Sequence, residues 1–148
     1  MNWKYKNGEI SEISEFPDNT FGFVYMITHL PSGKAYIGKK VLFHNRKVKL
    51  TKKELTEYAG VVGRRPSYKI AVKESDWHKY WGSNKALTSL IKEEPKENFE
   101  RFILHCCSSK KLLTYHEVKY QMVYQVLERP DEFFNDNILG KFFHKDFD

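Results

Sequence analysis

Two tyrosines lie in neighbouring segments that both read as β-strands. The stretch FGFVYMITHLPSGKAYIGKK, residues 21–40, places Tyr25 and Tyr36 on either side of the turn sequence LPSGK. A phenol hydroxyl both donates and accepts hydrogen bonds, so such a pair could take part in a reaction. A tyrosine on a strand more often packs in the core or against a cross-strand neighbour. The two segments by themselves leave both interpretations open.

Glu117 is the second candidate, because its helix places it beside apolar residues. On a helical wheel of the segment SSKKLLTYHEVKYQMVYQVLERP it borders Leu113, Tyr120 and Tyr124, at the shoulder of the apolar arc. A carboxylate there is partly desolvated, and leaving it without a cation would cost on the order of a few kcal/mol. The expected cation is Lys110, an arginine or a divalent metal, since Mg²⁺ prefers carboxylate oxygens.

The positive charge of the chain is concentrated in one segment. The net charge is +6, and residues 39–73 hold eleven Lys or Arg and two Glu, which gives +9. The other residues hold fourteen basic and seventeen acidic side chains, which gives −3. A basic segment on a slightly acidic body attracts polyanions, of which nucleic acid is the usual one. The alternative is a solvated basic loop without a partner.

The composition is that of a globular protein. With 148 residues, of which 41% are apolar, the chain fits one domain over residues 1–148. No run of 18 apolar residues predicts a membrane span, and the N-terminus has no secretory signal. Cys106 and Cys107 are adjacent, so they indicate reduced thiols on a strand of a cytoplasmic protein rather than a disulfide framework.

The order of expected elements favours an α+β fold, an α/β sandwich with a small antiparallel or mixed central sheet of about three strands flanked by helices. Residues 21–28 and 35–40 are expected to form a hairpin, and residues 98–107 a third strand. A helical pattern follows Ser83 up to Pro95. A second one fills residues 108–130, where Pro130 is expected to end the helix.

The segment between the hairpin and the Ser83 helix is harder to interpret. Residues 41–50 favour a helix or helical turn, and Thr51 with Glu54 forms a capping box for a short helix. Residues 60–72 predict an extended basic loop, because they contain two glycines and a proline. We treat residues of about 47–73 as a basic insert and about 131–148 as an aromatic C-terminal tail. That tail is either part of the core or a partner surface.

The tyrosine segments resemble the signature of a known enzyme family. FVY (23–25) and YIG (36–38), with ten residues between the tyrosines, are similar to the signature of the GIY-YIG nuclease superfamily, with Phe23 in place of the first glycine. The resemblance continues through Arg46, the segment 80–104, Glu117 and Asn135, in the family's order. It spans about residues 21–139 and points to the phage and homing-endonuclease members.

The resemblance implies a divalent-metal-dependent DNA endonuclease that hydrolyses phosphodiester bonds with a tyrosine-activated water. Tyr25 would be the base or water-positioning group, and its free pKa near 10 would have to be poised by nearby positive charge. Arg46 would hold the nonbridging oxygens, and Mg²⁺ or Mn²⁺ on Glu117 would neutralise charge on the phosphate and the leaving 3′ oxygen. Tyr36 would orient water or phosphate.

Further residues have supporting roles in this scheme. Gly38 would let the backbone approach the site. Asn135 matches a structural or catalytic asparagine of the family and would, as a catalytic residue, bond the tyrosine or fix the helix of Glu117. His78 would assist proton transfer, unless it is a surface or packing residue. The expected DNA contacts come from the basic residues around the insert: Lys39, Lys40, Lys47, Arg64, Arg65 and Lys69.

The partner implied is double-stranded DNA, bound with modest sequence specificity and strong salt dependence. A homodimer would allow both strands to be cut. The expected location is the cytoplasm, that of the host cell if the chain is encoded by a phage. The competing hypothesis is a catalytically inactive nucleic-acid-binding protein that retains the nuclease fold.

Overall fold

The computed structural model describes residues 1–60, 63 and 66–147. Arg64 and Arg65, which were predicted to contact DNA, lie outside the described residues. The chain divides into two compact units, the first formed by residues 1–42 and 76–148 and the second by residues 43–75. The insert expected at about 47–73 falls within the second unit.

The first unit is built on a five-stranded sheet with the order β2-β1-β7-β3-β4. Its strands are β1 (Trp3–Tyr5), β2 (Gly8–Ile10), β3 (Gly22–His29), β4 (Ala35–Val41) and β7 (Phe99–Cys107). Only β1 and β7 are parallel; the other neighbours are antiparallel. The mixed α+β fold is confirmed, but the sheet has five strands rather than about three. β1 and β2 were missed because three residues are too few to show alternation.

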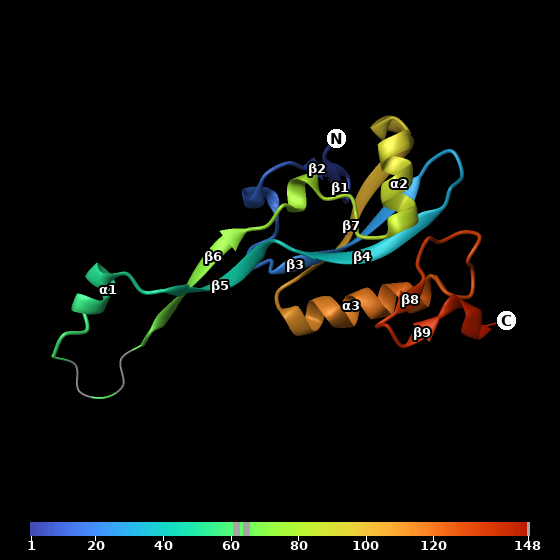
Figure 1. Ribbon diagram of the computed structural model, residues 1–148. Helices are drawn as coiled ribbons and strands as arrows, with labels where there is room; N and C mark the ends of the chain where they lie inside the picture. Colours follow the sequence, from blue (N-terminus) through green and yellow to red (C-terminus); the bar gives the residue numbers. More distant parts are fainter. Residues whose placement is uncertain (61–62, 64–65, 148) are drawn as a thin grey trace. The chain divides into compact units, whose positions relative to one another are not determined.

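Two layers cover the sheet on opposite faces (Figure 1). Helix α3 (Lys110–Val123) packs on one face, where Val24, Ile37 and Leu113 belong to a single apolar cluster. The other face carries Trp3, Phe23 and Tyr25, whose rings contact one another at centroid distances of 5.0–6.3 Å, and helix α2 (Lys85–Glu93) lies on this side. The sheet is thus the middle layer of the expected sandwich.

The helix ends differ from those expected. Asn84 rather than Ser83 caps α2, because its side chain accepts a hydrogen bond from the backbone N–H of Leu87 at 3.0 Å. Helix α3 begins after the cap Ser109 and ends at Val123, well before Pro130. Gln125 has a φ of 55°, a left-handed conformation that a helix cannot continue through.

The remaining short elements of the first unit connect these layers. They are the 3₁₀ turns η1 (Ile13–Glu15), η2 (Trp77–Lys79), η3 (Lys96–Asn98) and η4 (His144–Phe147), and the strands β8 (Asn137–Ile138) and β9 (Phe142–Phe143). The aromatic tail is divided: Phe133 and Phe134 are buried, whereas Phe142 and Phe143 are exposed.

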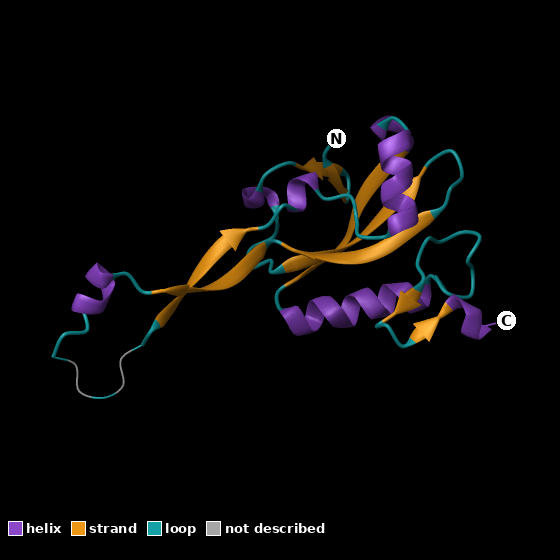
Figure 2. Ribbon diagram, in the orientation of Figure 1, coloured by secondary structure: helices purple, strands orange, loops and turns teal. Residues whose placement is uncertain are grey.

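The second unit is a two-stranded antiparallel ribbon with one short helix. Strands β5 (Phe43–Lys49) and β6 (Tyr68–Glu74) pair along their whole length, and α1 (Lys52–Thr56) lies between them in the chain (Figure 2). The capping box of Thr51 and Glu54 is confirmed. The helix or helical turn expected at 41–50 is corrected to strand β5 over Phe43–Lys49. Of the extended loop expected at 60–72, residues 68–72 belong to β6, and residues 61–62 and 64–65 lie outside the described residues. The pairing of β5 with β6 joins residues about 25 positions apart, and local patterns do not reveal such contacts.

Within the part of the chain that the structure describes, no helix has the length and apolar character needed to cross a membrane.

Candidate active site

The register of the hairpin brings the two tyrosines together. Tyr25 lies directly opposite Gly38, and Tyr36 opposite Ile27, so both side chains emerge on the same face of the sheet. The ring centroids are 6.2 Å apart. A Cβ at Gly38 would lie 2.5 Å from the Tyr25 hydroxyl oxygen and 2.9 Å from a Tyr36 ring carbon. Glycine at this position therefore lets both rings pack across the backbone.

Tyr25 is almost completely buried, with 1% of its surface exposed. Its hydroxyl is hydrogen-bonded to the side chain of Tyr80, and the two rings meet edge to face at 5.8 Å. Tyr25 is thus a core residue that also contacts the rings of Tyr36 and Tyr80.

Arg101 positions the segment that carries Tyr80, and it was not among the residues predicted from the sequence. Its guanidinium donates hydrogen bonds to the carbonyls of Tyr80 (2.7 Å), His78 (3.0 Å) and Met1, and it lies 4.2 Å from the ring of Trp81. Burial lowers the pKa of Arg101 to about 10. A signal was present: a charged residue at an inward position of an alternating strand requires buried partners.

The surroundings of the tyrosines raise their pKa values. Burial, then the neighbouring Tyr80 and Tyr36 hydroxyls, and then Glu117 raise the pKa of Tyr25 well above its usual value. Burial also raises the pKa of Tyr36, although a hydrogen bond with Ser83 opposes it. These directions are opposite to the poising by positive charge that was expected for Tyr25. Both phenols are therefore neutral at pH 7 in this environment.

A polar hollow of about 610 Å³ lies beside β4, one of the two edge strands of the sheet. Tyr36 reaches it from one face of the sheet and Glu117 from α3 on the other. We call it the edge hollow; its lining residues are Tyr36, Lys39, Ser83, Asn84, Lys85, Glu117, Gln121, Asn135, Asp136, Asn137 and Leu139. It is where the sequence-predicted Tyr36, Lys39, Glu117 and Asn135 come together.

Asn135 and Gln121 fix the strand that carries Tyr36. The Asn135 side chain accepts from the Ile37 N–H at 3.1 Å and donates to the Ile37 carbonyl at 2.8 Å, and Gln121 donates to the same carbonyl at 3.0 Å. Asn135 therefore bonds the backbone between Tyr36 and Gly38. It was expected to bond a tyrosine side chain or to fix the helix of Glu117.

Glu117 faces the edge hollow with a side chain only 16% exposed. Burial raises the pKa of its carboxyl, and Lys39 opposes this shift. Among the described residues, the cation paired with it is Lys39, at 4.0 Å from the carboxylate. The Lys39 ammonium also donates to the Thr114 hydroxyl at 3.0 Å. From the sequence, the expected cation was Lys110, an arginine or a divalent metal. A 4.0 Å contact is the loose limit of an ion pair, so the carboxylate is incompletely compensated.

The residues of the edge hollow fit a magnesium-type ion. Among the residues that the structure describes, no three His, Cys, Asp or Glu side chains form a closed ligand set. Mg²⁺ in phosphoryl-transfer sites uses one or two carboxylates and completes its shell with water and substrate phosphate. A partly buried, incompletely paired carboxylate is suited to that mode in a hollow that Asp136 and several amides also line, and Glu117 is the ligand this arrangement offers.

The other predicted site residues of the first unit are placed differently. Lys40 lies 2.5 Å from Asp76 and 4.0 Å from the centre of the Tyr80 ring, and its side chain is 13% exposed. Lys40 therefore serves the fold around Tyr80. The His78 ring packs edge to face on Trp77 at 5.4 Å, and its backbone carbonyl accepts from Arg101.

Arg46, Lys47 and Lys69 belong to the second unit. Arg46 lies on β5 opposite Ala71, and its side chain and that of Lys47 are exposed. Lys69 lies on β6 and forms an ion pair with Glu54 at 2.6 Å. The predicted arginine thus comes from a strand rather than from the expected helical turn.

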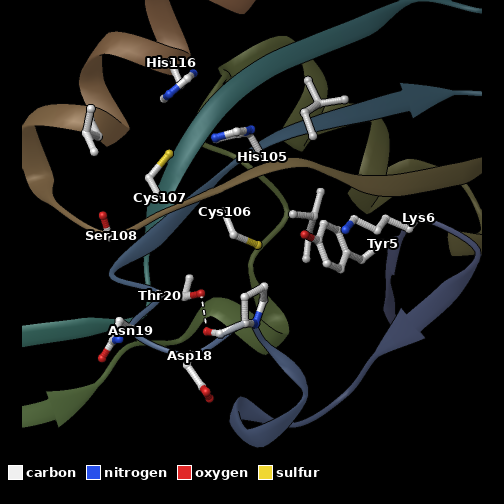
Figure 3. A pocket seen from close by; sticks show the side chains of 14 residues that line it. Tyr5, Lys6, Asp18, Asn19, Thr20, His105, Cys106, Cys107, Ser108 and His116 are labelled. Atoms are coloured by element: carbon white, nitrogen blue, oxygen red, sulfur yellow. Dashed lines mark hydrogen bonds between the residues drawn. The ribbon is translucent and has the colours of Figure 1, made fainter.

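A second hollow of about 580 Å³ lies against β7, α3 and the N-terminal segment (Figure 3). The rings of His105 and His116 stack at 4.1 Å on one side, and Cys106 is hydrogen-bonded to Tyr5 on the other. Both cysteines are free thiols on a strand, as predicted. Burial raises the pKa of Cys106 to about 11, so this thiol is not a nucleophile at neutral pH.

A scan against family models gives one decisive match. Residues 3–138 match the model described as "Putative endonuclease segE, GIY-YIG domain". The chain belongs to the GIY-YIG family. The match extends over the sheet, α2, α3 and the segment with Asn135, so this GIY-YIG domain includes the whole edge hollow except Leu139. The comparison with curated proteins gave no match, and the comparison with solved structures gave none either.

Proposed function

We propose that this GIY-YIG domain is a DNA endonuclease that hydrolyses phosphodiester bonds at the edge hollow. The observation that carries the proposal is Glu117, a desolvated carboxylate with a raised pKa and only a 4.0 Å cation contact, facing a hollow that Tyr36 also lines. Structural carboxylates are normally paired, whereas carboxylates that bind metal and phosphate are kept free.

The tyrosines act as neutral hydrogen-bonding groups in this proposal. Tyr36, which lines the hollow and is hydrogen-bonded to Ser83, orients the attacking water or the phosphate. Tyr25 is buried behind Tyr36 and hydrogen-bonded to Tyr80. In this proposal its neutral hydroxyl donates or accepts a hydrogen bond within the group of Tyr25, Tyr36 and Tyr80 that positions the water, and it does not act as a free phenolate. A divalent cation on Glu117 would supply positive charge to the phosphate and leaving oxygen, and it would also counter the carboxylate that raises both pKa values.

We assign a phosphate-binding role to two basic side chains, Lys39 and Arg46. Lys39, at the edge hollow and 39% exposed on its side chain, contacts a phosphate oxygen. Arg46 keeps the family's role on nonbridging oxygens, with its fixed fork of donors. Asn135 and Gln121 are positioning residues, since both hold Ile37 between Tyr36 and Gly38.

The test is cleavage of supercoiled plasmid with Mg²⁺, with Mn²⁺ and with EDTA. Wild type is expected to nick or cut with either metal, and Glu117→Gln and Arg46→Ala to lose at least about 100-fold in rate. Glu93→Gln, the same substitution at an exposed position of α2, is the matched control and should cut normally. Binding of DNA without metal-dependent cleavage by wild type would refute the proposal and favour an inactive nucleic-acid-binding protein.

A further inference from the structure

The entire net charge of the protein resides in the second unit. Residues 43–75 contain nine Lys or Arg and three Glu, a net of +6. The other residues contain sixteen basic and sixteen acidic side chains, since 25 − 9 = 16 and 19 − 3 = 16, so their net charge is zero. The second unit is therefore the part of the protein to which a polyanion is attracted.

The β5–β6 ribbon of this unit has two unlike faces. Directly opposite residues of an antiparallel pair share a face, so the register assigns the side chains. One face, here called the apolar face, contains Tyr68, Ile70 and Val72, with Lys49, Lys47 and Asn45 across from them. The opposite face contains Lys69, Ala71 and Lys73, with Val48, Arg46 and His44 across from them.

The apolar face is strongly exposed. Tyr68, Ile70 and Val72 expose 58%, 68% and 64% of their surface, although they alternate as strand residues do when they face a partner. A protein core is a poor occupant, because Lys47 and Lys49 lie directly opposite Ile70 and Tyr68 and would be buried with them. A second copy is also disfavoured, since it would bring another unit of the same +6 charge.

A DNA groove satisfies both features of this face. The major groove of a duplex is about 12 Å wide and admits a two-stranded β-ribbon. Its floor presents the methyl groups of thymine to apolar side chains, and its walls present phosphates to lysines. Asn45, across from Val72, carries an amide of the kind that pairs with adenine.

We propose that the apolar face of the β5–β6 ribbon enters the major groove, with Ile70 and Val72 on thymine methyl groups and Lys47 and Lys49 on the flanking phosphates. This inference rests on the proposed function, in that duplex DNA is the substrate. It differs from simple gripping of the backbone, because it gives the ribbon a preference for A·T base pairs.

The test measures duplex affinity by fluorescence anisotropy in the Glu117→Gln protein, which does not cleave. One A·T-rich duplex contains thymidine, and its twin contains deoxyuridine, which lacks the methyl group. The parent is expected to bind the thymidine duplex about 3–10-fold more tightly. Val72→Thr combined with Ile70→Thr should abolish that preference. Val48→Thr, the same valine substitution on the opposite face, is the matched control and should keep it.

The lysines are tested through salt. Lys47→Gln with Lys49→Gln should lower the slope of log affinity against log salt by roughly 0.9 for each phosphate that the variant no longer neutralises. An unchanged slope would overturn the assignment of these two lysines.

The remaining outcomes separate this inference from the proposed function. Equal affinity of the Glu117→Gln protein for both duplexes would overturn the groove contact. This comparison uses an unaltered ribbon, so misfolding of a ribbon variant cannot affect it. A dimer in light scattering that Ile70→Thr dissociates would identify a second copy as the occupant and would also overturn it. Plasmid cleavage by wild type together with either result leaves the nuclease intact. Absent cleavage with a clear thymidine preference would refute the nuclease alone.

Discussion

At the scale of single residues, Glu117 links the chemistry to the stability of the fold. Burial raises the pKa of its carboxyl in the folded protein, so the folded protein binds this proton more readily than the unfolded chain does. The contribution to stability is therefore greatest below the unfolded pKa and falls as the pH rises through the folded one. At pH 7 the ionised carboxylate destabilises the free protein, a cost often found at functional sites.

Glu117→Gln is accordingly expected to be inactive but more stable. Its melting temperature at pH 7 should exceed that of wild type by about 2–4 °C, and the difference should shrink towards pH 4, where wild type is protonated. Added Mg²⁺ should raise the melting temperature of wild type and not that of the variant. Calorimetry at the two pH values measures all three effects, with Glu93→Gln as the control. A less stable variant at pH 7 would contradict the desolvation argument.

At the scale of elements, the hairpin β3–β4 can position Tyr36 because the outward-facing backbone groups of β4 are hydrogen-bonded. Ala35 donates to the carbonyl of Glu132 at 3.0 Å and accepts from the N–H of Phe134 at 2.7 Å. The next outward-facing position, Ile37, is bonded by Asn135 and Gln121. The strand thereby holds Tyr36 and Gly38 in fixed positions.

Asn135→Ala should cost about 1–3 kcal/mol of unfolding free energy, because it leaves the buried N–H of Ile37 without its partner. Gln121→Ala should cost less, since the Ile37 carbonyl keeps Asn135 as a donor. The double variant should cost more than the sum, because it removes both donors from one carbonyl. Urea denaturation of the four proteins gives the coupling energy, and strict additivity would show that the two side chains act independently.

Prediction from sequence succeeded where the pattern was local. The alternation of residues 21–28, the turn LPSGK and the capping box at Thr51 each involve neighbours in the chain, and each was found. The ribbon was missed, because Arg46 and Ala71 pair across 25 residues and local sequence patterns do not reveal such a contact. Within the site, the family resemblance indicated Tyr36, Glu117 and Asn135, but the bond from Asn135 to Ile37 depends on tertiary contacts.

At the scale of the whole molecule, the two units differ in how they are stabilised. The first has buried layers on both faces of its sheet, whereas the second is a two-stranded ribbon with one short helix. Isolated two-stranded hairpins are marginally stable, so opening of the ribbon requires less free energy than opening of the central sheet.

Hydrogen exchange should reveal this difference. In the free protein, the amides of β5 and β6 are expected to exchange faster than those of β3 and β7, because fewer buried contacts resist their opening. Addition of duplex DNA to Glu117→Gln should slow exchange in β5 and β6 several-fold. Exchange measured by mass spectrometry checks both statements; equal protection of β6 and β7 in the free protein would contradict the first.

The segment of residues 132–135 also bears on how the protein can be handled and altered. An uncovered edge strand is a template for pairing with other chains, and β4 is an edge strand of its sheet. The backbone of residues 132–134 forms hydrogen bonds with the outward-facing N–H and carbonyl of Ala35, and the Asn135 side chain bonds the N–H of Ile37. Together they cover the edge as a short extra strand would. Proteins truncated at the C-terminal side before residue 132 would therefore expose the unpaired backbone edge of β4. They are expected to form insoluble aggregates, even though Tyr25, Tyr36, Arg46 and Glu117 are retained.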